Sequence, residues 1–250
     1  MDLLDRVAYL WKNNREELLK AGNQITVAIN QEQTGTGKKP DRQLVERAYS
    51  QLTQRFDHKW GGFGAAPKFP TPHNLLFLLR YADTMQESNA LKMVEVTLED
   101  MARGGIFDHI GGGFSRYSTD EMWLVPHFEK MLYDNALLLI AYDKAYQHTK
   151  KESFADTADR TAGYILRELT DEEGGCYCGQ DADSDGVEGK YYVFTPEEVK
   201  TVLGEENGEE FCRLYDITDA GNFEGKSIPN RIHTSENGSD INDPRLEKLY

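Results

Sequence analysis

The sequence is poor in cysteine and in positive charge, and each shortage excludes a class of protein. Its three cysteines, Cys176, Cys178 and Cys212, are odd in number and form neither a CxxC motif nor a zinc-ligand spacing. Reduced thiols in a cytosolic protein are expected, not a disulfide framework. Lysine and arginine total 28 against 43 aspartates and glutamates, a formal net charge of −15. Nucleic acid and anionic membrane surfaces both require clustered cations, so we predict neither as a partner.

Long apolar runs are absent as well. No stretch approaches the roughly 20 apolar residues that span a bilayer. The first residues, Met1-Asp2-Leu3-Leu4-Asp5, lack the basic and apolar regions of a secretory signal. We therefore predict a cytoplasmic protein with no membrane-spanning segment. A length of 250 residues is sufficient to bury a substantial core.

The sequence is rich in helical periodicity. Apolar residues recur at spacings of three and four along most of the chain. Capping signals mark several helix starts, such as Thr71-Pro72 and Thr195-Pro196, and the polar residues 30–40 are typical of a linker. Together these signals predict helices at 3–21 with Gly22 near the end, from Asp41 to about 56, and at 74–81, 90–103, 126–148, 153–169 and 195–203, with one strand at 190–194.

A glycine–aromatic junction occurs three times, always between two predicted helices. Trp60-Gly61-Gly62-Phe63 recurs as Gly111-Gly112-Gly113-Phe114 and as Gly174-Gly175-Cys176-Tyr177, each with an aspartate nearby. Repeats of this size predict stacked helical hairpins whose loops gather at one rim. Glycine permits close approach of the backbone to a ligand, although ordinary hairpin turns would give the same pattern.

The segment 104–135 is the richest in side chains that do chemistry. A carboxylate beside an imidazole, as in Asp108-His109, can tune proton transfer near neutral pH. His127, Lys130 and Asp134 follow at helical spacing and continue into an apolar face. They either line a cavity or form an internal salt-bridge network. The predicted catalytic residues are Asp108, His109, His127 and Asp134.

Substrate-binding residues are expected around them. Arg116 and Tyr117 can clamp a sugar hydroxyl or carboxylate, and Trp123 can stack on a sugar ring. Loop aromatics such as Phe63 and Phe69 form either a stacking platform or a plug of packed side chains. The predicted binding residues are Phe63, Lys68, Arg116, Tyr117, Trp123, Glu129, Lys130, Asp183 and Glu188.

An acidic stretch, residues 181–188, begins like an EF-hand calcium loop. The match fails at its twelfth position, where Tyr192 stands in place of the required bidentate glutamate. Its carboxylates are expected to line the cleft or to form a solvated turn. We predict no metal site and no cofactor.

Four segments resemble the spermatogenesis-associated protein 20/YyaL-like family of thioredoxin-domain-containing proteins. They are residues 61–72, 104–136, 181–199 and 221–228, and the longest reads GGIFDHIGGGFSRYSTDEMWLVPHFEKMLYDNA. The resemblance implies a mainly α fold, a partial (α/α)6 toroid of helical hairpins with short β segments in the loops. That domain is similar to six-hairpin glycosidases and N-acylglucosamine 2-epimerases, which implies a small-molecule carbohydrate as the ligand.

The same resemblance implies a division of the chain. Residues 1–25 are expected to be the last helix of an upstream thioredoxin-like domain, 26–40 a linker, and 41–250 an incomplete toroid. We therefore expect a fragment whose partner in the full-length protein is the thioredoxin-like domain.

Three functions are compatible with these residues. A sugar epimerase or isomerase with histidine acid/base chemistry requires His109 and His127 in one cleft. Glycoside hydrolase-like chemistry requires two carboxylates among Asp108, Asp134, Asp183 and Glu188 to face each other across it. A non-enzymatic scaffold would fill the cleft with aromatic side chains and pair its charges. We favour the first, because histidines dominate the segment 104–135.

Overall fold

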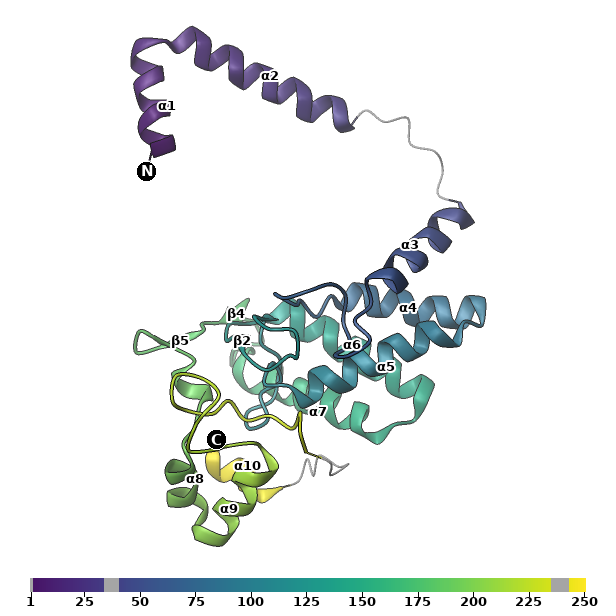
Figure 1. Cartoon of the computed structure of the whole chain (residues 1–250), viewed down its shortest axis with the longest axis vertical. Coiled ribbons are helices and arrows are strands. Elements are labelled where there is room, and N and C mark those ends of the chain that lie inside the picture. The colour runs from purple at the N-terminus through teal and green to yellow at the C-terminus, as the bar shows by residue number, and fades with distance from the viewer. Residues whose placement is uncertain (1, 34–40, 235–242) are drawn as a thin grey trace. The chain divides into compact units, whose positions relative to one another are not determined.

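The computed structural model describes residues 2–33, 41–234 and 243–250. Its internal contacts divide the chain into two units, Met1–Val45 and Glu46–Tyr250, and Figure 1 traces both. The larger unit contains the helical hairpins and all the short strands. Each unit has its own internal arrangement.

The smaller unit differs from the predicted single helix. Helix α1, Asp2–Asn13, is followed by α2, Arg15–Gln33, with Asn14 between them, a residue type that favours helix N-caps. Helix α2 runs through Gly22 because one glycine costs a helix only about 1 kcal/mol, and the Thr26 hydroxyl bonds the Gly22 carbonyl at 2.9 Å. The predicted linker 26–40 is thus helical as far as Gln33, and residues 34–40 lie outside the described part.

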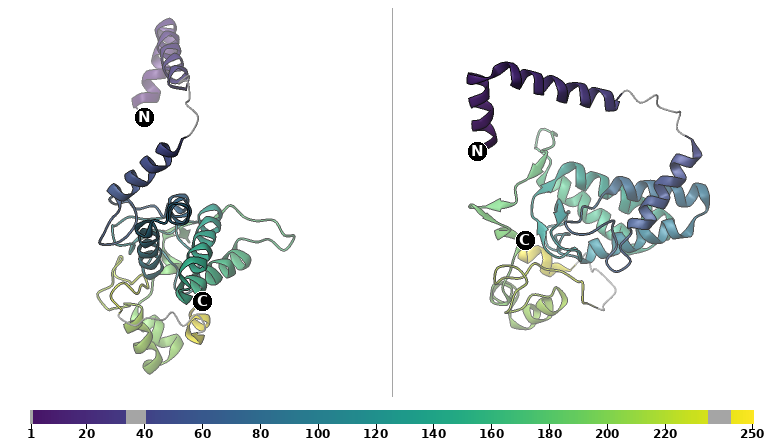
Figure 2. Two further views of the ribbon diagram at one scale, coloured as in Figure 1. Left: turned by 90° about the vertical axis from the view of Figure 1, so that its right-hand side faces the viewer. Right: turned by 45° about the horizontal axis from the view of Figure 1, so that its top comes forward.

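Two antiparallel helical hairpins form the body of the larger unit. Helix α3, Arg42–Arg55, begins close to its predicted start, where the Asp41 side chain accepts the Leu44 N–H at 2.9 Å. The hairpins follow as α4, Pro72–Met85, with α5, Ser88–Arg103, and α6, Leu132–Thr149, with α7, Glu152–Glu168. Figures 1 and 2 show these four helices side by side. Hairpin topology therefore brings the loops 56–71, 104–131 and 169–195 to one end of the bundle.

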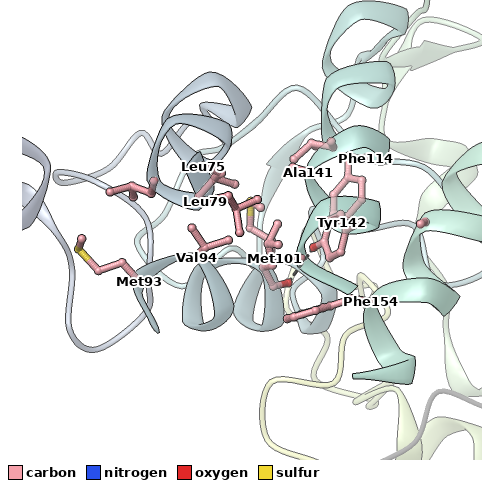
Figure 3. Packing of buried hydrophobic residues seen from close by; sticks show 14 of the residues in the cluster. Leu75, Leu79, Met93, Val94, Met101, Phe114, Ala141, Tyr142 and Phe154 are labelled. Carbon is pink, nitrogen blue, oxygen red and sulfur yellow. Dashed lines mark hydrogen bonds between the residues drawn. The ribbon is translucent and has the colours of Figure 1, made fainter. Parts of the chain in front are cut away.

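The apolar faces of these helices make one core. Leu75 of α4 and Val94 of α5 are fully buried, and Tyr142 of α6 belongs to the same cluster, with its hydroxyl donating to the Leu98 carbonyl at 2.7 Å. Figure 3 shows this packing, including Phe114, which enters from a loop and stacks on Tyr142 at 5.4 Å. The core thus anchors the loop end of the bundle.

The predicted helix 126–148 is wrong in its first six residues. Pro126–His127 (β2) pairs with Tyr117–Ser118 (β1), and Lys130–Met131 (β3) pairs with Gly179–Gln180 (β4), before α6 begins at Leu132. His127 and Lys130 therefore do not share a helical stripe with Asp134. Residues 126–131 adopt an extended conformation because neighbouring loops supply the hydrogen bonds of their backbone, and alternate residues turn inward.

The C-terminal part adds small helices and one more hairpin. Strands Asp183–Ser184 (β5) and Val187–Glu188 (β6) pair with each other. The predicted strand 190–194 is instead a 3-10 helix, η1, Lys190–Tyr192, because Gly189 turns the chain at φ 72°. The predicted capping box at Thr195 is confirmed at the start of α8. The remaining helices are α8, Pro196–Leu203, α9, Glu205–Leu214, and α10, Pro244–Leu249.

The predicted fold class is confirmed. The chain is mainly α, with antiparallel helical hairpins and with short β segments confined to the loops. Thr71 begins α4 as predicted, but its side chain makes no capping hydrogen bond.

Candidate functional site

The three glycine–aromatic junctions are tight hairpins, each begun by an aspartate. The backbone N–H of Asp57, Asp108 and Asp171 bonds the carbonyl of a junction glycine at 2.8–3.0 Å. In each hairpin the aspartate side chain accepts the backbone N–H two residues later at 2.8–2.9 Å. The repeat read from the sequence is therefore a repeated local structure.

Each of the first two hairpins is closed by a buried lysine, and the two lysines make the same kinds of contact. We call these two arrangements the lysine clamps. Lys68 pairs with Asp57 and donates to the Gly61 carbonyl at 2.8 Å. Lys130 pairs with Asp108 at 2.7 Å and donates to a junction carbonyl at 2.9 Å. Burial opposes ionisation of Asp108, but the Lys130 charge and backbone N–H groups outweigh it and lower the pKa of Asp108. This is the arrangement of an internal salt-bridge network.

Backbone pairing joins the three loops. Lys68 pairs with Ser118 across the first and second loops, and Lys130 pairs with Gln180 across the second and third. The predicted gathering of the junctions at one end of the helices is thus a property of the structure. Side chains that are distant in sequence meet there.

Trp123 joins the first two loops from inside. Its ring is fully buried, its Nε1–H donates to the Trp60 carbonyl at 2.7 Å, and a Cβ added to Gly62 would lie 2.6 Å from it. The ring is therefore enclosed by protein. Phe63 likewise packs on Phe56, with centroids 5.9 Å apart.

His109 is a core residue. Only 3% of it is exposed, and its Nε2 lies 3.0 Å from the Gly104 carbonyl oxygen. Burial, together with the positive charge of Arg160, lowers the pKa of His109 to about 3. The imidazole is thus neutral at physiological pH and is positioned among Phe107 and Tyr215.

His127 has different surroundings and lies in a half-exposed cluster of polar side chains. Its Nδ1 is 2.8 Å from a Glu188 carboxylate oxygen, and its Nε2 is 3.8 Å from Glu129. Arg116 donates to the same Glu129 oxygen at 2.8 Å. The cluster therefore combines an imidazole with an orienting carboxylate, the arrangement that general bases use.

An aromatic stack runs beside this cluster. Tyr117 lies against His127 with centroids 5.2 Å apart, and Phe69 lies on Tyr117 at 4.8 Å. Phe69 is 49% exposed, so the stack ends in an open aromatic face. Such a face next to hydrogen-bonding groups suits a sugar ring, which has apolar C–H faces and polar edges.

Two polar atoms at the cluster lack partners within the described part of the chain. They are Nε of Arg116 and Oδ2 of Asp134, both shielded from solvent. Burial raises the pKa of Asp134 to about 6, although a hydrogen bond with Tyr133 and the charge of Arg116 act in the opposite direction. Asp134 can therefore exchange a proton near neutral pH.

The raised pKa of Asp134 predicts a stability difference that depends on pH. Ionisation of a buried carboxyl costs free energy, so wild-type stability falls as the pH rises from about 4 through about 6. We expect Asp134→Asn to increase the free energy of unfolding by about 1–2 kcal/mol at pH 8 and to have no effect at pH 3.5. Urea denaturation at both pH values measures this, and an equal change at both would contradict it.

The remaining predicted residues divide between two places. Glu188 belongs to the His127 cluster, whereas Asp183, Asp108 and Lys130 line a cavity of about 320 Å³. Sequence reasoning missed Gln180, which also lines the cavity, and Tyr133 beside Asp134. A signal for Gln180 was its place at the end of the third junction.

Neither a metal site nor a membrane-spanning helix is found among the described residues. Across residues 2–33, 41–234 and 243–250, no group of three or more His, Cys, Asp or Glu side chains is arranged to hold a metal ion. None of the described helices combines the length and apolar character needed to cross a membrane.

Comparison with known proteins identifies relatives of the chain. No family model matches it. It is 39% identical over 254 residues to spermatogenesis-associated protein 20 of Homo sapiens. The aligned region covers 91% of this chain and 32% of that protein. The chain is homologous to spermatogenesis-associated protein 20. The resemblance predicted from the sequence is therefore confirmed.

Further relatives extend this finding. The mouse spermatogenesis-associated protein 20 is 38% identical over 255 residues, again 91% of this chain and 32% of that protein. An uncharacterized Caenorhabditis elegans protein is 34% identical over 247 residues, 91% of this chain and 34% of its own length. The chain thus spans about a third of the length of spermatogenesis-associated protein 20.

Solved structures similar to this chain include a sugar epimerase from a ruminal bacterium. That likeness has a TM-score of 0.48 and 16% identity, covering 70% of this chain and 55% of the epimerase. Cellobiose 2-epimerase from Spirochaeta thermophila gives a TM-score of 0.47 and 18% identity, covering 56% of this chain and 40% of that protein.

Proposed function

We propose that this chain belongs to a carbohydrate-active enzyme that moves protons on a bound sugar, as an epimerase or isomerase does. The observation that supports it is the His127 cluster. It places an oriented imidazole, a carboxyl with a pKa of about 6 and an arginine beside an open aromatic face. These are the group types that acid/base chemistry on a sugar requires.

Each residue has a role in this proposal. Glu188 accepts the Nδ1–H of His127, which leaves Nε2 as the base that removes a proton next to a sugar carbonyl. Arg116, whose side chain is 41% exposed, supplies positive charge beside the oxygen on which negative charge develops. Asp134 supplies or accepts the second proton. Phe69 and Tyr117 carry the apolar face of the ring.

Proton exchange in heavy water tests the proposal. The protein is mixed in D₂O with glucose, mannose, galactose or N-acetylglucosamine, and ¹H NMR follows loss of the C2 proton. We expect exchange by the wild type and a 10²- to 10⁴-fold slower rate for His127→Ala, the usual contribution of one acid/base group.

His148→Ala is the matched control. His148 is also bonded to a carboxylate, Asp83 at 2.9 Å, but it lies in the last turn of α6, roughly 20 Å along that helix from Asp134. Exchange at an unchanged rate in His127→Ala would contradict the proposal. Cleavage of a glycosidic bond would favour carboxylate chemistry instead, and absence of sugar binding would favour the scaffold.

The setting of the enzyme is part of the proposal. All three cysteines are free thiols, as in proteins of a reducing compartment, which supports a cytoplasmic location. The family resemblance supports a thioredoxin-like domain as the covalent partner. Fractionation of cells that express the full-length protein tests the location, and domain-resolved proteolysis tests the partner.

A further inference from the structure

A polar cavity lies at the same loop end as the His127 cluster. Its volume is about 320 Å³ and its lining includes Lys130, Gln180, Asp183, Tyr191 and Tyr192. This volume lies at the lower end of the range for small-ligand sites, about 300–1,000 Å³. It is therefore suited to one ring-sized group.

The charges of the cavity floor are already balanced. Lys130 is 1% exposed, pairs with Asp108 at 2.7 Å and lies 4.5 Å and 4.8 Å from the ring centres of Tyr164 and Tyr192. Its positive charge is thus compensated before any ligand enters. A strongly anionic ligand would have to compete with Asp108, so a neutral ligand suits the floor better.

The walls offer hydrogen bonds of both kinds. The Gln180 side-chain oxygen accepts the Tyr164 hydroxyl at 3.0 Å, which orients the amide and leaves its NH₂ group as a donor. The Asp183 carboxylate is an exposed acceptor, and Tyr191 is 52% exposed and adds an aromatic surface. Donors, acceptors and an aromatic face together match a polyhydroxylated ring.

The hairpin β5–β6 connects this cavity to the His127 cluster. Asp183 and Glu188 are direct partners in its antiparallel ladder, and such partners place their side chains on the same face about 5 Å apart. Asp183 lines the cavity while Glu188 bonds His127 at 2.8 Å. Two adjacent side chains of one hairpin therefore contribute, one to the cavity and the other to the His127 cluster.

We propose that the cavity is a second sugar subsite, which holds the ring next to the one bound at His127. The substrate class is then an oligosaccharide of at least two rings. This inference rests on the proposed function of the His127 cluster. It adds that affinity depends on chain length through residues that do not contact the reacting ring.

Calorimetric titration of paired sugars tests the subsite. The pairs are glucose with cellobiose, mannose with mannobiose, and N-acetylglucosamine with chitobiose. In the wild type we expect at least one disaccharide to bind tenfold or more tightly than its monosaccharide. Tyr191→Ala is expected to abolish that difference and to leave monosaccharide affinity within twofold of wild type.

Tyr177→Ala is the matched control, because Tyr177 is 53% exposed on the third loop and is not among the residues that line the cavity. It should keep the disaccharide advantage. If monosaccharides bind in a His127-dependent way but disaccharides gain nothing, or Tyr191→Ala leaves the gain intact, the subsite is overturned and the proposed function stands. If no sugar in the three pairs binds, both are overturned.

Discussion

Replacing Lys130 with methionine is expected to lower the free energy of unfolding by about 3–5 kcal/mol, the cost of leaving a buried charge without its partner. Methionine keeps the length of the side chain but removes the charge that pairs with Asp108 at 2.7 Å. Urea denaturation followed by circular dichroism at pH 7.5 measures the change.

The pH dependence identifies the cause. In the wild type the lowered pKa of Asp108 contributes stability that is present above its unfolded pKa and is lost as the pH falls through its folded value. In Lys130→Met the unpaired carboxyl can be protonated instead, so the difference from wild type should shrink toward pH 4. A loss below about 1 kcal/mol at pH 7.5 would show that Asp108 finds another partner.

The first lysine clamp provides a matched comparison. Lys68→Met removes an equivalent contact, but Asp57 is 21% exposed against 13% for Asp108. Water can therefore partly replace the lost charge, and we expect a smaller loss. The double variant Asp108→Asn/Lys130→Met should recover part of the stability lost in Lys130→Met, because no buried charge remains.

Replacing Trp123 with alanine is the second large effect that we expect, a loss of about 3–5 kcal/mol. The ring is fully buried and its N–H bonds the Trp60 carbonyl at 2.7 Å, so truncation leaves both a cavity and an unpaired carbonyl. Thermal unfolding and urea denaturation measure the loss.

Trp60→Ala is the control for this change. Trp60 is only partly buried, so truncation of its ring should cost about 1 kcal/mol while its carbonyl stays in place. Equal costs for the two tryptophans would contradict the structural role of Trp123. Sugar binding by Trp123→Ala, measured below its unfolding temperature, should weaken only through disorder of the loops.

Local signals in the sequence were sufficient for the helices that carry their own start and stop. The proline and glutamate after Thr195 predict α8 because the capping contacts lie within four residues. The predicted end of the helix 90–103 likewise agrees with α5, which Gly104 caps. The glycine–aromatic repeat predicted that the loops lie together at one end of the helices, since each copy of the repeat forms the same turn, which an aspartate side chain stabilises.

The segment 126–131 could not be predicted in this way. Its alternation, with Phe128 and Lys130 buried and His127 more exposed, also satisfies a helical spacing when read together with Asp134. Its strand partners lie in other loops, so the deciding hydrogen bonds are nonlocal. Local periodicity alone therefore extended the helix six residues too far.

The candidate site was predicted in part for the same reason. His127 and Glu188 are 61 positions apart, and only the fold brings them to 2.8 Å. Burial determines which of the other predicted residues a ligand can reach. Histidine, for example, is enclosed at position 109 and accessible at position 127. A sequence does not distinguish these environments where the surrounding segments are loops.

The third glycine–aromatic hairpin differs from the first two in a way that bears on variation among relatives. It has no lysine clamp among the described residues; Asp171 instead bonds the exposed Tyr177 hydroxyl at 2.7 Å. A Cβ at Gly175 would meet nothing within 4 Å, whereas one at Gly113 would lie 2.4 Å from the Tyr164 ring. A side chain at position 175 therefore has room in this hairpin, whereas one at position 113 does not, so the third hairpin can vary at this position among relatives without loss of the fold.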